Sequence, residues 1–404
     1  MAFYLLASIV VFFLAGSSAP TPLYSVYQAE WGFSPITTTV VFGVYALAVL
    51  LSLLITGRLS DHVGRRPVLL AAIAAQAATM VLFTTADGVP ILMLARVIQG
   101  LSTGAAVAAV GAGMLDLNRA RGTVANAVAP LTGTALGALG SGLLVQFLPA
   151  PTHLVYLALL AVFALQWLGV LLMREPSTPA PGPSKSAALA SLLPQFGLPR
   201  TARRPLLLAV PALVAIWALA GFYGSLGPAL VRLVVGSNAL ALGGLGLFVL
   251  AASAAITVLL LHRSSARVLL SVGATALFAG SALTYLAIGE RSAALLFAGM
   301  LVAGAGFGGG FQGAVRTVIP LAAPHERAGV LSLLYVVSYL AMGLPAVIAG
   351  YFVVDGGGVV STAKEYAVAV MVLAAVAALG TLRPAHPEPL LVPAHRELVE
   401  ASAT

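Results

Sequence analysis

The sequence contains no cysteine and very little charge. Of its 404 residues, 8% are charged and 60% are hydrophobic, whereas soluble domains carry about 25% charged and roughly 45–50% apolar residues. The lack of cysteine excludes disulfide frameworks, thiolate metal sites and cysteine nucleophiles. A single soluble core could not bury so much apolar surface, because such cores stop growing near about 250–300 residues. The composition therefore predicts an integral membrane protein.

Lysine is almost as scarce, since Lys185 and Lys364 are the only two. Neither lies in a G-x-x-x-x-G-K-[ST] loop, so ATP hydrolysis is not expected. The six histidines are scattered and show no metal-ligand spacing, so we expect no metal, no cofactor and no enzymatic activity. The net charge of +8 is interpreted as a signal of membrane topology and not of nucleic-acid binding.

Long apolar segments make up most of the sequence. About 20 apolar residues cross roughly 30 Å of hydrocarbon as a helix that pairs its own backbone groups. We therefore expect an all-α fold with twelve transmembrane helices, at residues 3–25, 36–56, 67–86, 90–115, 123–147, 152–173, 206–228, 238–261, 267–288, 292–316, 328–353 and 362–382. The first segment is also similar to a secretory signal peptide, but it lacks a basic region before its apolar run.

The basic residues predict the orientation. With both termini in the cytoplasm, sixteen of the twenty Lys and Arg residues face inward, Arg96 lies within a span, and three face outward: Arg232, Arg291 and Lys364. This asymmetry is typical of cytoplasmic loops. We expect a monomer in the cytoplasmic (inner) membrane, with bundles of six helices at 1–173 and 206–382, a proline-rich linker at 174–205 and a tail at 383–404.

The two halves resemble each other weakly. Arg121 and Gly137 are separated from Arg327 and Gly343 by the same offset of 206 residues. Internal repeats of this kind are expected in transporters that bind a substrate between two halves.

The loop between the second and third segments reads GRLSDHVGRR and matches G-x-L-x-D-x-x-G-R-R. It resembles the signature loop of the major facilitator superfamily, whose members are transporters built from two six-helix bundles that rock around a central cavity. His62 stands where that family usually has a basic residue. The resemblance implies a latch that holds the bundles together when the cavity opens outward, formed by Gly57, Asp61, Gly64, Arg65, Arg66, Arg119 and Arg121.

Two further motifs are similar to those of the family. Arg96, Gln99 and Gly100 match R-x-x-Q-G in the fourth span. The fifth span matches the drug–proton antiporter motif G-x-x-x-G-P-x-x-G-G only in part, because Ala138 replaces the proline and Ser141 a glycine. The resemblance favours bacterial efflux members, although close helix packing explains these glycines equally well.

By the same resemblance, a substrate cavity is expected to draw polar and aromatic side chains from both halves: Ser18, Tyr24, Tyr45, Arg96, Gln99, Trp217, Tyr223, Phe307, Gln312, Tyr335 and Tyr339. Such a mostly aromatic set favours a hydrophobic or amphipathic small molecule over a sugar, which needs several amides and carboxylates. We expect export by alternating access. Facilitated passage or uptake of a small metabolite or organic anion stays open, as does a channel.

The acidic residues give little support to proton coupling. All twelve carboxylates lie at span ends, in loops or in the tail, whereas proton-coupled carriers generally titrate a buried group. The best candidate for proton antiport is Glu30, just beyond the first span, paired with Arg96.

Overall fold

The computed structural model describes residues 1–176, 189–194, 197–323 and 326–382. Within these ranges all regular structure is helical, and twelve helices are long and apolar enough to cross a membrane. The all-α prediction is confirmed. The helices are α1 Ala2–Ser18, α2 Pro20–Trp31, α3 Pro35–Thr56, α4 Leu59–Val63, α5 Arg65–Thr84, α6 Val89–Leu117, α7 Arg119–Phe147, α8 Pro151–Leu172, α10 Arg200–Ser225, α11 Gly227–Val235, α12 Ala241–Leu260, α13 Ala266–Glu290, α14 Ala293–Val318, η1 Ile319–Leu321, α15 Arg327–Asp355 and α16 Gly358–Leu382.

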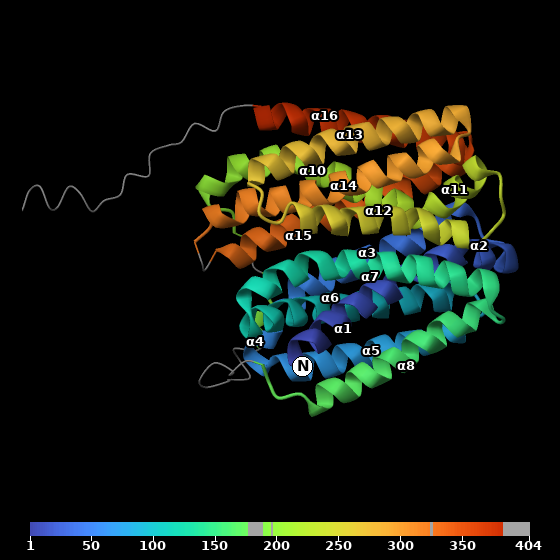
Figure 1. Ribbon diagram of the computed structural model, residues 1–404. Coiled ribbons are helices and arrows are strands. Elements are labelled where there is room, and N and C mark those ends of the chain that lie inside the picture. The colour runs from blue at the N-terminus through green and yellow to red at the C-terminus, as the bar shows by residue number, and fades with distance from the viewer. Residues whose placement is uncertain (177–188, 195–196, 324–325, 383–404) are drawn as a thin grey trace, which may run out of the picture.

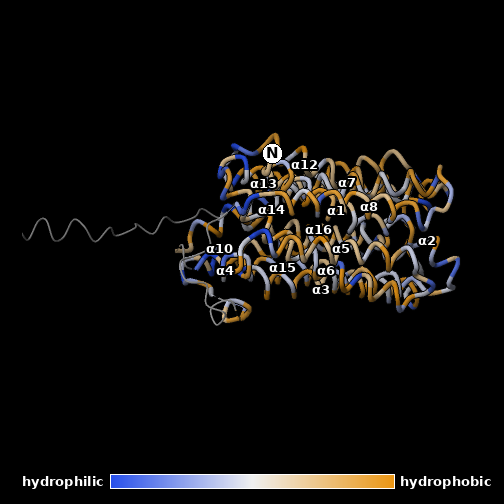
Figure 2. The backbone as a smooth tube through the Cα atoms, turned by 90° about the horizontal axis from the view of Figure 1, so that it is seen from below, coloured by the Kyte–Doolittle hydropathy of each residue, from blue (hydrophilic) through white to orange (hydrophobic). Residues whose placement is uncertain are grey.

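The helices form two bundles, α1–α8 and α10–α16, which lie one above the other in Figure 1. Each bundle has its own apolar core, one around Phe13 and Phe163 and the other around Leu213 and Leu296. Hydrophilic residues gather mainly at the two ends of the molecule, with apolar helices between them (Figure 2). One end carries α4 and the last residues of α16, and the other carries α2 and α11 (Figure 1).

The first span of each bundle is interrupted. The first span breaks at Ala19 between α1 and α2, just before Pro20, and the seventh breaks at Leu226 between α10 and α11, before Pro228. Proline has no N–H to donate and crowds the preceding turn, so it favours a break at each of these points. The first span therefore continues to Trp31, beyond the predicted end at residue 25.

The predicted linker at 174–205 ends earlier than expected. Residues Arg200–Arg204 form the first turns of α10 because arginine is a good helix former. Most of the remaining linker and the whole tail at 383–404 lie outside the described residues.

The repeat suggested by the sequence has a structural counterpart. A Cβ atom added to Gly137 in α7 would overlap with the carbonyl oxygen of Ala15 in α1. In the other bundle, a Cβ atom on Gly221 in α10 would overlap with the carbonyl oxygen of Met342 in α15. Ala15 and Gly221 are 206 residues apart. The crossing of α1 with α7 therefore corresponds to the crossing of α10 with α15, at the offset found in the sequence.

The bundles meet along two helix pairs, α3 with α15 and α7 with α12. The closest approaches lie towards the end that carries α2 and α11, where glycines leave no room for a side chain. A Cβ atom on Gly350 would overlap with Thr39, and one on Gly244 would overlap with the Ala138 carbonyl oxygen. Close backbone contacts of this kind are typical of helix packing in membranes.

Candidate functional site

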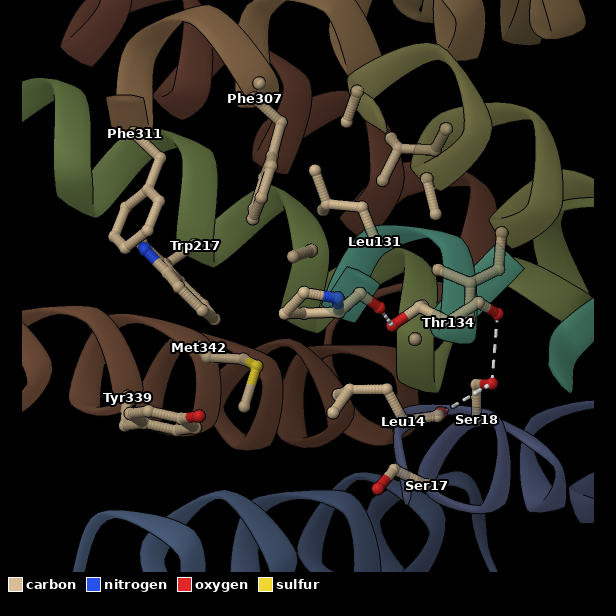
Figure 3. Close-up of a pocket in the computed structure, with 18 of the residues that line it drawn as sticks. Leu14, Ser17, Ser18, Leu131, Thr134, Trp217, Phe307, Phe311, Tyr339 and Met342 are labelled. Carbon is tan, nitrogen blue, oxygen red and sulfur yellow. Dashed lines mark hydrogen bonds between the residues drawn. The ribbon is translucent and has the colours of Figure 1, made fainter. Parts of the chain in front are cut away.

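A cavity of about 260 Å³ lies between the two bundles. Its wall draws on α1, α2, α3, α6 and α7 from the first bundle and on α10, α12, α14 and α15 from the second. Figure 3 shows Leu14, Leu131 and Thr134 facing Trp217, Phe307 and Met342 across it. Among the lining residues that the structure describes, none carries a charge. The site therefore suits an apolar body with a few polar atoms.

An aromatic cluster centred on Trp217 forms one side of the cavity. The Trp217 ring lies 5.5 Å from Phe307, 5.6 Å from Phe311 and 5.4 Å from Tyr339, measured between ring centroids. The buried indole Nε1 of Trp217 has no hydrogen-bond acceptor in the described part of the chain. In Figure 3 this nitrogen lies beside the Phe311 ring, which offers at most a weak N–H···π contact.

The opposite side holds hydroxyl groups that are tied to the backbone or to each other. Ser18 Oγ donates to the Thr134 carbonyl oxygen at 3.0 Å (Figure 3), and Tyr45 Oη donates to Ser17 Oγ at 2.7 Å. Asn126 Nδ2 donates to the Gly111 carbonyl oxygen at 3.0 Å. These bonds fix the polar side chains in place, because each removes rotamers that the side chain would otherwise populate.

Seven of the eleven residues predicted for the cavity line it: Ser18, Tyr45, Trp217, Phe307, Gln312, Tyr335 and Tyr339. The other four, Tyr24, Arg96, Gln99 and Tyr223, do not line it. Tyr223 turns into the second bundle, where its hydroxyl pairs with Thr284 Oγ1 at 3.0 Å. A buried phenol needs such a partner, and Thr284 supplies it away from the cavity.

Arg96 is fully buried inside the first bundle. Its Nε donates to the Tyr24 hydroxyl at 3.0 Å, and its Nη1 donates to the Ser17 carbonyl oxygen at 2.9 Å and to Gln99 Oε1 at 2.6 Å. The structure does not bring Arg96 and Glu30 together, because Glu30 is exposed near the end of α2. A guanidinium in an apolar bundle requires acceptors for its donors, and Tyr24, Ser17 and Gln99 provide them.

Several lining residues were not predicted. Phe42, Phe311 and Met342 add apolar surface, and Thr103 and Asn126 add polar atoms. For two of them, the sequence contained a feature that could have placed them in the cavity. Phe311 follows Phe307 by four residues and therefore shares its helix face, and Asn126 is an uncharged amide within a predicted span.

The predicted latch residues meet only in part. Arg65, with 8% of its side chain exposed, donates to Ser60 Oγ at 2.6 Å, pairs with Asp61, and bonds Asp116 Oδ2 at 3.2 Å. All of these partners belong to the first bundle, and the Asp61 side chain is 51% exposed. In this conformation, within the described residues, Asp61 therefore pairs with its own bundle and not with the second one.

Arg119 and Arg121 lie on the exposed first turn of α7 and not against Asp61. Asn118 caps that helix by accepting from the Arg121 N–H at 2.9 Å, and both arginines follow this cap on the exposed first turn. Gly57 ends α3, and Gly64, at a φ of +94°, precedes α5. This left-handed φ favours glycine.

Glu175, which follows α8, was not predicted to take part in the loop. Its carboxylate accepts from the backbone N–H of Arg65 at 2.8 Å and of Arg66 at 3.0 Å. It thus caps the N-terminus of α5, where a negative charge is favourable. Arg66 Nε in turn donates to the Val170 carbonyl oxygen at 3.2 Å, so the loop is fastened to α8.

Comparisons with known proteins agree with this architecture. The structure is similar to that of the nucleoside transporter NupG in its D323A form, with a TM-score of 0.70, 13% sequence identity, and coverage of 94% of this chain and 97% of the other. It is also similar to the human organic anion transporter MFSD10 (TETRAN), with a TM-score of 0.65, 17% identity, and coverage of 93% and 98%. At these identities the likeness shows the fold.

No curated protein sequence matches the chain. The sequence model of the Major Facilitator Superfamily matches residues 6–346, which is most of the chain. With its twelve spans, its paired bundles and the cavity between them, this chain belongs to the Major Facilitator Superfamily and is a membrane transporter.

Proposed function

We propose that the transporter exports hydrophobic or amphipathic small molecules by alternating access. The observation that carries this proposal is the cavity between the bundles, which both bundles line with aromatic and aliphatic side chains and few polar ones. A sugar would leave many hydroxyls without partners on such a wall, whereas an apolar solute gains about 25 cal/mol for each Å² of surface that it buries.

The arrangement of the bundles is compatible with export, although an importer passes through the same state. If the arginine-rich loops face the cytoplasm, as the positive-inside rule predicts, the end with α4 is cytoplasmic and the tight contacts at Gly244 and Gly350 lie at the outer side. The conformation is then inward-facing and accepts substrate from the cytoplasm or the inner leaflet. In this state a latch at Asp61 is released, in keeping with the partners of Asp61 inside its own bundle.

Export coupled to protons is the first candidate mechanism. Uncoupled facilitation is the second, and one observation favours it: the described cavity lining contains no carboxylate and no histidine. A proton-coupled cycle would then have to titrate a group outside the cavity. The names of the similar structures, a nucleoside transporter and an organic anion transporter, add nucleosides and organic anions to the substrates that should be screened.

The proposal is tested with purified protein in liposomes that carry an imposed pH gradient and a lumenal pH dye. We expect saturable uptake of hydrophobic aromatic compounds that accelerates when unlabelled compound is present on the far side. A change of lumenal pH that depends on substrate indicates proton antiport, and flux without such a change indicates facilitation. Transport of nucleosides or sugars with no flux of any hydrophobic compound would overturn the proposal.

A further inference from the structure

Within the part of the chain that the structure describes, Arg96 forms no ion pair. Its side-chain acceptors are the Tyr24 hydroxyl, the Ser17 carbonyl and the Gln99 amide oxygen, all of them neutral. The ion pairs found within the described residues both belong to Arg65. Because a guanidinium is not deprotonated in proteins, the first bundle holds one full positive charge in its interior.

This charge lies directly behind the cavity wall. The Arg96 guanidinium carbon is 5.1 Å from the ring centroid of Tyr45, and Arg96 Nη1 is 2.9 Å from the carbonyl oxygen of Ser17. Both Tyr45 and Ser17 line the cavity. A single layer of side chains and backbone therefore separates the guanidinium from a bound molecule.

The surroundings transmit the field of Arg96 into the cavity. Buried charges are screened far less than exposed ones, and the described lining has no charge of its own. The guanidinium also occupies the neighbourhood of the Tyr45 ring, which makes that ring a poorer site for a second cation. Both effects favour a negative group over a positive group in the cavity.

An independent observation points to an oxygen on the ligand. The buried Nε1 of Trp217 has no acceptor in the described part of the chain, and an indole N–H can only donate. This nitrogen lies beside the Phe311 ring and is shielded from the cavity (Figure 3), so an oxygen of a carboxylate or carbonyl becomes its acceptor only when the indole turns as the ligand binds. A cationic head group, which has donors and no acceptor, would leave this N–H unsatisfied in either position.

We propose that the cavity selects amphipathic substrates with an aromatic or aliphatic body and an anionic, carboxylate-like head, and that Arg96 sets this charge preference. The inference rests on the proposed function, since it names the substrate class of the same cavity. Arg96 acts here as a positioning and electrostatic residue, because neutral side chains separate it from the substrate.

The test uses three probes of the same shape and different charge: 2-naphthoate, 2-naphthamide and 2-naphthylmethylammonium. Their binding to the full-length protein in nanodiscs of uncharged lipid is measured by equilibrium dialysis at pH 7.5, with empty nanodiscs subtracted. We expect the anion to bind about tenfold more tightly than the cation, as a weakly screened unit charge implies, with the amide between them. Equal binding of anion and cation, or tighter binding of the cation, would overturn the proposal.

Three variants assign the preference to Arg96. In Arg96→Gln the ratio of anion to cation affinity should fall to about one, while Arg96→Lys should keep most of it. Ser17→Asp leaves Arg96 in place and adds a carboxylate to the wall, so it should also abolish the preference. The amide probe should change by less than about threefold in each folded variant, because its binding depends little on charge.

These outcomes separate the two proposals. If all three probes bind and compete with one another but the ratio survives in both Arg96→Gln and Ser17→Asp, Arg96 is a structural residue and this inference fails while the proposed function stands. If none of the three probes binds, the proposed function fails and the inference falls with it. If Arg96→Gln does not fold, the inference is still tested by the ratio of anion to cation affinity in Ser17→Asp and in the unaltered protein.

Discussion

Thr21 Oγ1 donates to the carbonyl oxygen of Gly224 at 3.2 Å, across the boundary between the two bundles. The two residues lie beside the breaks in the first and seventh spans, and both line the cavity. Phe42 adds a second contact at this point, because a Cβ atom on Gly224 would come within 2.6 Å of its ring. Thr21 and Gly224 therefore line the cavity and also take part in the contact between the bundles at the end that carries α2 and α11.

Thr21→Val should loosen that contact. The substitution keeps the shape of the side chain and removes the donor, and a buried hydrogen bond contributes about 0.5–1.5 kcal/mol. We expect the population that is open at the α2 end to rise by about three- to tenfold. This population is measured from the distances between spin labels on two introduced cysteines, one in α2 and one in α11. Ser25→Ala is the control, because Ser25 donates only within α2, to Pro22.

Asp61→Asn should shift the same equilibrium in the opposite direction. If Asp61 latches the bundles in the outward-open form, its loss favours the form seen here, and transport slows. The thermal stability should change little, since the half-exposed pair with Arg65 contributes at most about 1 kcal/mol. Asp87→Asn, an exposed acid at the other end, is the matched control. Unchanged transport and unchanged label distances in Asp61→Asn would remove the latch from the account.

Trp217→Phe should weaken binding of hydrophobic substrates. The smaller ring loses contact with Phe307, Phe311 and Tyr339, and aromatic pairs contribute about 0.5–1.5 kcal/mol beyond their buried area. We expect KM to rise by about three- to tenfold with little change in protein yield. Trp167→Phe in α8 is the control, because Trp167 packs against the first core and lies outside the cavity. Equal effects of the two substitutions would indicate a general packing defect.

Gly137→Ala and Gly140→Ala should change stability in opposite directions. A methyl group at Gly137 meets the backbone of Ala15, and overpacking of this kind costs about 1–3 kcal/mol. A methyl group at Gly140 meets nothing within 4 Å, so alanine there should stabilise the helix by roughly 0.5–1 kcal/mol. The midpoint of thermal unfolding in detergent distinguishes them. A similar midpoint for both variants would mean that α1 and α7 are not packed as described.

The composition and the period of apolar segments were enough to predict the twelve spans, since apolar segments of about 20 residues are long enough to cross a membrane as helices that pair their own backbone groups. The breaks at Ala19 and Leu226 also had a signal in Pro20 and Pro228, although the prediction did not use it. Depth along the helices and the family resemblance led to five of the aromatic residues of the cavity, Tyr45, Trp217, Phe307, Tyr335 and Tyr339, but not to Phe42 and Phe311. Arg96 could not be placed in this way, because the direction of a long side chain depends on acceptors that belong to other helices.

In the signature loop, too, contacts between residues close in the sequence could be predicted, and contacts between distant helices could not. Asp61 and Arg65 are four residues apart and meet across Gly64, between α4 and α5, a contact that their short separation in the sequence indicates. The carboxylate of Glu175 is 110 residues away from Arg65 and caps α5 all the same. No pattern in the sequence joins these two positions, because the contact depends on how α8 packs beside α5.

Alternating access requires that the bundles separate at the α2 end during transport. Gln146 in α7 and Leu240 at the start of α12 are joined there by a hydrogen bond of 2.7 Å, and the chain has no cysteine of its own. The direct measurement is substrate flux in Gln146→Cys/Leu240→Cys after a short thiol crosslinker is added. We expect flux to stop on crosslinking and to return when the link is cleaved, with both single variants unaffected. Flux that continues at full crosslinking would contradict alternating access in this protein.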